Sequence, residues 1–376
     1  MTTPIDAVRL PDPYPYYATL VAERPLAFDE RLGAWVASDA ASVRAVLSSG
    51  ALRVRPPAEP VPAGITGTPA GEVFGDLVRM TDGELQHRLK SVVVDALGRV
   101  DAVHAADLAV ERTREVLAAG GRPPFEELMF GVPARVVAGL CGLDRGADAE
   151  AARLIGDFVQ CIPASAGPPE QKSAALAAGR LQELLGPGID RGDDGTGLLA
   201  ELVRSARRAS WPSTAPLLAN AIGFLSQTYD ATAGLIGNTL VALARGTRWP
   251  QQPAAEALVR EVVRHDAPVQ NTRRFAAESF HHADAEIAPG AQVLVVLAAA
   301  NRDPAVNPDP GALRPDRAAP AVFTFGAAAH RCPGETLAVA VTTAVVGELL
   351  AAGFDPAELP AEVAYRPLAN ARIPVL

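Results

Sequence analysis

The chain has 376 residues, of which 49% are hydrophobic and 20% charged, and it carries a formal net charge of −9 at pH 7. This composition excludes a disordered chain, and the acidic balance without any basic stripe excludes a nucleic-acid-binding protein. Abundant alanine and only 5% aromatic residues favour helices over sheets.

The sequence also bears on location. The N-terminus lacks the charged and apolar regions of a signal peptide, and no apolar run reaches membrane-spanning length. The three cysteines (Cys141, Cys161 and Cys332) are spaced too irregularly for a disulfide framework or a CxxC metal site. We therefore expect a cytoplasmic protein with no membrane partner.

The N-terminal part predicts small elements. We expect a short helix over 12–24, a hairpin over 26–38 that turns at Gly33, and a helix over 39–49 capped by Asp39. Frequent Pro and Gly over 53–80 predict a long loop, and such loops often act as lids or binding segments.

Helices dominate the rest of the chain. They are expected over 82–97, 101–119, 124–142, 253–266 and 335–352, with breaks at 163–169 and 191–197 and short strands and turns over 269–304. The longest periodic stretch, 213–246, is apolar nearly all round and predicts a buried central helix. No linker or repeat is visible, so we expect a single domain over 1–376.

The segment FGAAAHRCPGETLA (325–338) is the first candidate for chemistry. It places Cys332 before the helix at 335–352, with Pro333 at the first turn, where a missing N–H costs nothing. A helix N-terminus stabilises a thiolate, and His330 and Arg331 add positive charge. A lone cysteine is usually buried and inert, and this motif alone leaves a nucleophile and a metal ligand both open.

Two further features precede the cysteine. Glu261 and Arg264 lie three residues apart on one helical face, which by itself indicates an ordinary surface ion pair. A coil rich in Pro and Asp, NRDPAVNPDPGALRPDR (301–317), ends at Arg317. The order of these features is more specific than any one of them: Glu-x-x-Arg, strands, coil and cysteine loop.

In this order of motifs the chain resembles the bacterial soluble cytochromes P450, which are heme-thiolate monooxygenases. The resemblance runs from DPYPYYATL to YRPLANARIPVL. It implies a mainly α fold with a small β-rich part, and heme b buried between the central helix and the helix after the cysteine loop. It also implies that Cys332 is the proximal ligand of the iron, a thiolate that donates electron density and favours O–O cleavage.

The resemblance implies roles for other residues. Those that hold the heme would be His330, Arg274, Lys90, Gln86, Phe325 and Gly326. Gln86 and Lys90 stand where relatives carry His and Arg, and His87 and Arg88 beside them leave a shift of one residue open. Glu261, Arg264 and Arg317 would form a structural network on the proximal side.

The cysteine loop departs from the family at two places. Relatives carry Gly at position 328, and Ala328 would carry strain of about 1 kcal/mol or more if the positive φ is kept. We expect the loop to keep its path with slight distortion. Pro333 removes a backbone donor near the sulfur, which would make the thiolate more electron-donating.

The central helix departs further. The oxygen-binding stretch would be 227–232, in which Asp230 keeps the usual acid but Ala231 replaces the Thr that helps to deliver protons. Thr232, Thr228, ordered water or the substrate itself could replace that hydroxyl. Asp230, Ala231 and Thr232 are thus the candidate catalytic positions, and coupling or ring closure becomes as plausible as hydroxylation.

The resemblance also implies the substrate-facing residues: Phe224, Gln227, Thr228, Val269, Gln270, Asn271 and Leu368. The three amides suggest a substrate with amide or hydroxyl groups, although such side chains also satisfy one another or water. We expect a monomer that oxidises a small organic molecule in secondary metabolism, such as antibiotic biosynthesis. Electrons would come from a ferredoxin and its reductase, because the chain has no cysteine cluster of its own.

Two other classes stay in view. The alternative is a heme-thiolate protein that does not oxygenate its ligand, such as a heme isomerase, a dehydratase or a ligand-binding protein. The altered oxygen-binding stretch keeps it open, but Asp230 and the intact cysteine loop argue against it. A thiol-nucleophile enzyme is less consistent with the sequence, because no Cys–His pair with a third orienting group is visible.

Overall fold

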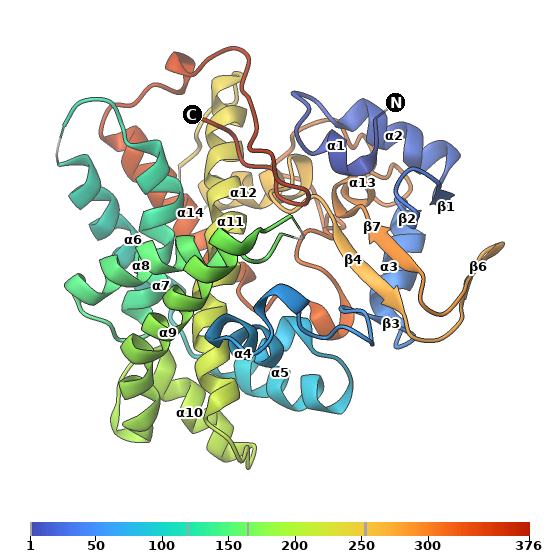
Figure 1. Cartoon of the computed structure of the whole chain (residues 1–376). Coiled ribbons are helices and arrows are strands. Elements are labelled where there is room, and N and C mark those ends of the chain that lie inside the picture. Colours follow the sequence, from blue (N-terminus) through green and yellow to red (C-terminus); the bar gives the residue numbers. More distant parts are fainter. Residues whose placement is uncertain (1, 119, 164, 252–253) are drawn as a thin grey trace. The chain divides into compact units, whose positions relative to one another are not determined.

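The computed structural model describes residues 2–118, 120–163, 165–251 and 254–376 (Figure 1). The chain divides into two compact units, each described here by itself. Unit 1 comprises Met1–Pro57, Ala233–Cys332 and Phe354–Leu376, and unit 2 comprises Ala58–Thr232 and Pro333–Gly353. The single domain over 1–376 stays a prediction.

Unit 1 contains a five-stranded mixed sheet in the order β1-β2-β7-β4-β3. The antiparallel hairpin of β1 (Leu26–Asp29) and β2 (Ala34–Ala37) confirms the predicted turn. In Figure 1, β7 (Gln292–Val295) lies beside β4 (Thr272–Ala276); β7 is parallel to β2 and antiparallel to β4, and β4 pairs with β3 (Leu52–Arg53). A separate pair joins β5 (Phe280–His282) and β6 (Ala285–Ile287).

Alternation along β7 places its side chains in two apolar clusters. Val293 and Val295 pack in one cluster with Val43 and Val46 of α3 (Ala40–Ser48), and Leu294 packs in the other with residues of α2 (Tyr14–Glu23). Successive side chains of a strand point to opposite faces, so one strand contributes to two cores. The remaining helices of unit 1 are α1 (Pro4–Ala7), α12 (Ala254–His265), α13 (Leu297–Asn301) and the 3-10 turns η5 (Ala328–His330) and η6 (Pro356–Glu358).

The three chain segments of unit 1 meet at a buried ion pair. Arg372, which is 1% exposed, donates to Asp266 over 2.8 Å and to the carbonyl of Val8 over 3.0 Å. Tyr14 donates to the same carboxylate over 2.9 Å. The first, middle and last segments are therefore joined through one carboxylate and one guanidinium.

Unit 2 is helical. Its elements are η1 (Ala63–Ile65), α4 (Pro69–Asp76), η2 (Val78–Met80), α5 (Gly83–Leu97), α6 (Ala102–Leu117), the π-helical η3 (Glu127–Gly131), α7 (Val132–Leu140), α8 (Arg145–Val159), α9 (Pro168–Asp190), η4 (Gly192–Asp194), α10 (Leu198–Arg208) and α14 (Glu335–Ala351). The long helix α11 (Ala215–Ala244) contributes its residues up to Thr232 to unit 2 and the rest to unit 1. Across the described ranges, no helix is long and apolar enough to cross a membrane.

Most predicted helices are confirmed within a few residues, but two expectations are wrong. The predicted loop over 53–80 contains α4 and two 3-10 turns, because Thr68 caps α4 by accepting from the Gly71 N–H and Pro69 starts it. Pro333 does not lie in the first turn of α14, since Gly334 (φ −96°, ψ 10°) is the cap and the helix begins at Glu335. The predicted boundaries at 119 and 253, and position 164 within the predicted break, lie outside the described residues.

Candidate functional site

Residues 323–332 of unit 1 form a tight loop that ends at Cys332. The Gly326 N–H donates to the Phe323 carbonyl over 2.7 Å, and the Cys332 N–H donates to the Phe325 carbonyl over 2.7 Å. Gly326 and Ala328 both have a positive φ, +69° and +50°. Ala328 thus keeps the conformation that suits glycine, as predicted, at a cost of about 1 kcal/mol.

The three cysteines have different surroundings. Cys141 and Cys161 are buried, and burial raises the pKa of their thiols to about 12 and about 11, so both stay protonated and inert. Cys332 is half-buried at the end of its loop. Of the three thiols, Cys332 is therefore the one that a ligand can reach.

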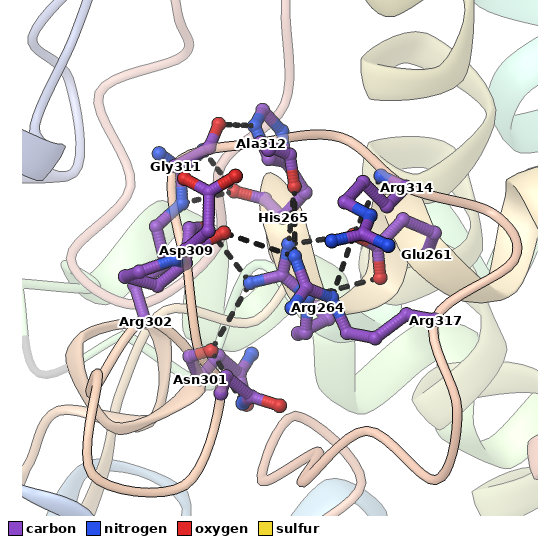
Figure 2. A network of polar contacts seen from close by, with 12 residues as sticks. Glu261, Arg264, His265, Asn301, Arg302, Asp309, Gly311, Ala312, Arg314 and Arg317 are labelled. Carbon is purple, nitrogen blue, oxygen red and sulfur yellow. Dashed lines mark hydrogen bonds and ion pairs between the residues drawn. The ribbon is translucent and has the colours of Figure 1, made fainter.

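The Glu261–Arg264 pair is fully buried rather than exposed (Figure 2). Arg264 donates to both carboxylate oxygens of Glu261, over 2.9 and 2.6 Å, and Arg317 approaches the same carboxylate to 3.4 Å. Burial alone would raise the pKa of Glu261, but hydrogen bonds from Arg264 and from the Arg314 N–H hold that pKa below its ordinary value. The carboxylate is thus kept charged between two guanidinium groups.

The two arginines also hold irregular backbone. Arg264 donates to the carbonyls of Pro310 and Ala312, over 2.9 and 3.0 Å, and Arg317 donates to Pro308 over 2.6 Å. Figure 2 shows the coil wrapped around these side chains. Because this coil has no regular partner strand or helix for its carbonyls, the guanidinium groups supply the missing donors.

Asn301 extends this arrangement to the cysteine loop. Its Oδ1 accepts from the Phe323 N–H over 2.6 Å, and its Nδ2 donates to Thr324 Oγ1 over 2.7 Å. The Thr324 hydroxyl in turn donates to the Val263 carbonyl of α12 over 2.8 Å. The sequence analysis did not assign this bracing role to Asn301 or Thr324. The signal available in the sequence was an Asn directly after the apolar run VLVVLAAA.

In unit 2, five consecutive residues of α11 are accessible. Residues 227–231 are half-buried, whereas 219–226 and, further along α11, 232–241 are all buried. The accessible window therefore coincides with the predicted oxygen-binding stretch, including Asp230 and Ala231, but not Thr232, which is 2% exposed. Thr228 Oγ1 donates to the Phe224 carbonyl over 2.8 Å and Gln227 Nε2 to the Gly223 carbonyl over 3.1 Å, so both side chains fold back onto the helix.

The remaining candidate heme-binding residues lie on several elements. In unit 2, both Gln86, which is buried, and Lys90, which is half-buried, are on α5. In unit 1, Arg274 of β4 is 5% exposed and donates to the Arg273 carbonyl over 2.8 Å. His330 is half-buried in η5.

The candidate substrate residues of unit 1 are mostly used internally. Gln270 is 0% exposed and its Nε2 donates to the Ala267 carbonyl over 2.7 Å. Asn271 donates to the Ala369 carbonyl over 2.8 Å, and Val269 forms a bridge with Ala371. Leu368 is half-buried. The side-chain amide of Gln270 thus donates to the backbone inside unit 1 and is not presented to a substrate.

Comparison with known proteins gives a consistent result. The family model described as cytochrome P450 matches residues 247–352. The cytochrome P450 monooxygenase PikC of Streptomyces venezuelae is 29% identical over 87% of this chain and 80% of its own length. The beta-dihydromenaquinone-9 omega-hydroxylase of Mycobacterium tuberculosis (strain ATCC 25618 / H37Rv) is 25% identical over 93% of this chain and 72% of its own length.

Solved structures share the fold. CalO2 superposes with a TM-score of 0.84 at 23% identity, covering 100% of this chain and 97% of that one. The bacillaene polyketide synthase cytochrome P450 PksS of Bacillus subtilis 168 superposes with a TM-score of 0.81 at 18% identity, covering 100% of this chain and 98% of that one. The solved structures show that the chain has the cytochrome P450 fold, and the matched family model and the relatives agree on the same family, whose members are monooxygenases that bind heme b through a cysteine thiolate.

Proposed function

We propose that this cytochrome P450 oxidises a small organic molecule in secondary metabolism, with Cys332 as the thiolate on the heme iron. The observation that carries the assignment is the contrast among the cysteines: two are buried and protonated, and Cys332 is half-buried at the end of a braced loop. A single thiolate ligand needs this combination of access and fixed position, so the residues fit a heme with a cysteine ligand.

Further residues would hold the heme in place. In unit 1 we propose Phe325 and Gly326 of the loop, with His330 and Arg274 as cationic partners for the propionates. In unit 2 we propose Lys90 and Gln86 of α5 for the same groups. When bound, the heme supplies the activation of dioxygen; the protein positions the substrate and moves protons.

The proton path is where this chain differs from its relatives. Ala231 has no hydroxyl, Thr232 is buried, and the Thr228 hydroxyl already donates to the Phe224 carbonyl. Of the candidate catalytic positions, Asp230 is left as the accessible titratable group. We propose that Asp230 relays protons through water or through a hydroxyl of the substrate.

Ala231→Thr tests this proposal. The variant is expected to raise the fraction of consumed NAD(P)H that appears in product, measured with a substrate found by its shift of the heme spin state. Ala231→Val, which matches Thr in shape but lacks the hydroxyl, is the control. Equal fractions in both variants would show that a hydroxyl at 231 is not what the native enzyme lacks.

The setting in secondary metabolism rests on similarity. PikC and PksS are named as monooxygenase and polyketide synthase P450s, and the RauA structure holds a biosynthetic intermediate of aurachin RE. We propose that this chain acts in an analogous pathway, such as antibiotic biosynthesis, as a cytoplasmic monomer. Its electrons would come from a ferredoxin and an NAD(P)H-dependent reductase.

The absorption spectrum of the reduced, CO-bound protein tests the ligand. The wild type and the variants Cys141→Ala and Cys161→Ala are expected to show the band that gives the family its name, because neither buried thiol contacts the iron in this proposal. Cys332→Ser is expected to lose that band. A band that survives in Cys332→Ser and disappears in either control would refute the assignment of Cys332.

A non-oxygenating heme protein remains the second candidate, because Ala231 removes the usual hydroxyl. A heme isomerase, dehydratase or ligand-binding protein would show the CO band without consuming dioxygen. Oxygen uptake that depends on NAD(P)H, ferredoxin and reductase, and that rises with a spin-shifting ligand, separates the oxidase from this alternative.

A further inference from the structure

The segment before α5 is tied to one face of α11 within unit 2. Asn220, which is 1% exposed, accepts from the Val78 N–H over 3.0 Å and donates to the Asp76 carbonyl over 2.9 Å. Gly223 allows close approach, since a Cβ there would lie 2.8 Å from Leu77 Cδ2 and 3.2 Å from Gln227 Nε2. Residues 76–78 are therefore fixed along α11 by contacts that the long predicted loop did not suggest.

The contacts follow the helical repeat. Asn220, Gly223, Gln227 and Asp230 are separated by three, four and three residues, so they share one face of α11. The last two belong to the accessible window of 227–231. Arg79 follows directly after the clamped segment, and Asp230 is the carboxylate whose charge acts on it.

The Arg79 guanidinium is unusual in its lack of partners. The side chain is half-buried, and no acceptor among the described residues takes a hydrogen bond from it or forms a close ion pair with it. Burial lowers the pKa of Arg79, and the charge of Asp230 offsets only part of that effect. A half-buried guanidinium has five N–H donors, and those that point away from water need acceptors that a ligand can supply.

We propose that Arg79 is the anchor for a carboxylate group of the substrate, which makes the substrate of this enzyme a small organic acid. The planar guanidinium matches a carboxylate with two parallel hydrogen bonds. Two donors to the ligand leave three more on the guanidinium, so the charge of Asp230 can still act on Arg79 when the ligand is bound. Asn220 holds residues 76–78 by two hydrogen bonds and so positions Arg79, which directly follows them. Arg79 selects the substrate, and Asn220 acts through Arg79.

This inference rests on the proposed heme enzyme, and the test separates the two. The probes are imidazoles that carry an N-linked alkyl chain ending in a carboxylate, in a series of chain lengths, and the primary amides of the same chains. The imidazole nitrogen ligates the iron and shifts the heme spectrum, so each affinity is read without any turnover. At one chain length the acid is expected to bind wild-type protein about tenfold or more tightly than its amide.

Three variants locate the effect. Arg79→Gln is expected to abolish the preference for the acid, and Arg79→Lys to keep part of it, because a lysine retains the charge but not the fork. Arg99→Gln is the matched control, since Arg99 is an exposed cation of the same unit that pairs with Asp95 over 3.3 Å. It is expected to keep the full preference.

The outcomes are distinguishable. If simple imidazole fails to shift the spectrum, the heme assignment is wrong and this inference falls with it. If imidazole ligates but acid and amide bind equally at every chain length, the carboxylate anchor alone is wrong. A preference for the acid that survives in Arg79→Gln would likewise remove Arg79 from recognition.

Discussion

Each unit contains a buried ionic cluster, and the two clusters use their charges differently. The coil cluster of unit 1 consists of Glu261, Arg264 and Arg317, whose guanidinium groups donate to one carboxylate and to backbone carbonyls of an irregular coil. In the helix cluster of unit 2 (Arg112, Glu115, Arg135 and Asp148), the donors go to carboxylates. Arg112 and Arg135 reach Asp148 over 2.9 and 3.2 Å, and Arg135 reaches Glu115 over 2.9 Å.

The two clusters differ in whether apolar side chains could replace them without loss of stability. The helix cluster connects α6, α7 and α8, whose backbone groups are already paired within regular helices. Apolar side chains of similar volume can often replace such a buried ion cluster without loss of stability. The coil cluster cannot be replaced in this way, because its cations are the donors for carbonyls that would otherwise be buried unpaired.

The largest effect is expected from Arg264→Met. It leaves Arg317, 3.4 Å away, as the remaining cation of the buried Glu261 and removes the donors to the Pro310 and Ala312 carbonyls, so we expect a loss of about 3–5 kcal/mol in the free energy of unfolding. Urea unfolding measures this loss, and the heme content per chain should fall with it. Arg260→Met, on the same helix but 40% exposed, is the control and is expected to cost less than about 1 kcal/mol. Equal losses in the two variants would contradict the role of the coil cluster.

The helix cluster offers the converse test. Asp148→Asn removes the fully buried one of the two carboxylates that Arg112 and Arg135 share, leaving them Glu115, and is expected to cost about 3 kcal/mol. Replacing Arg112, Arg135 and Asp148 together by leucine is expected to restore most of that stability. If the triple variant is no more stable than Asp148→Asn, the two clusters do not differ in the way described.

A smaller effect concerns acid. Burial, followed by the charge of Arg302, lowers the pKa of His265 from 6.5 to about 4, and its Nε2 lies 2.8 Å from the Gly311 carbonyl of the same coil. A depressed histidine pKa means that protonation favours the unfolded chain, so stability falls as pH drops from about 6.5 towards 4. Glu261, whose pKa is also lowered, contributes stability that is present above 4.5 and lost as pH falls below it.

His265→Gln is expected to flatten the upper part of this pH dependence and leave the part below 4.5. Unfolding in urea at intervals between pH 7 and pH 4 measures both parts. An unchanged profile in the variant would show that His265 does not titrate with unfolding.

The same comparison shows what could be predicted from the sequence. Glu261 and Arg264 are close in sequence, so a short motif predicts them, and the periodic pattern predicts α11 to within a few residues. The helix cluster joins residues from Arg112 to Asp148 on three helices, and no local pattern indicates which helix faces meet. The family, the fold and the heme cofactor could be predicted because short motifs, each local in sequence, follow one another in a specific order from Glu261 to Cys332.

The helix start within 53–80 and the position of Arg79 were both missed because this stretch was predicted to be a loop. Frequent Pro and Gly suggested a loop over 53–80, although Thr68 and Pro69 form a helix start within it. That error concealed the clamped segment before α5 and therefore Arg79. The apolar pattern of α11 predicted a helix buried throughout and did not indicate the half-buried residues 227–231, because only packing separates these residues from their buried neighbours. It was the resemblance that placed the oxygen-binding stretch there.

The three-segment construction of unit 1 has a consequence for biosynthesis on the ribosome. Val8 and Asp266 receive their partner Arg372 only when the chain has been synthesised beyond residue 372. Unit 1 therefore cannot complete its core during translation, and its N-terminal segment must wait for the arrival of the other two. Long-range closure of this kind is slow and leaves apolar surface exposed in the interval, so the nascent chain is a natural client for chaperones.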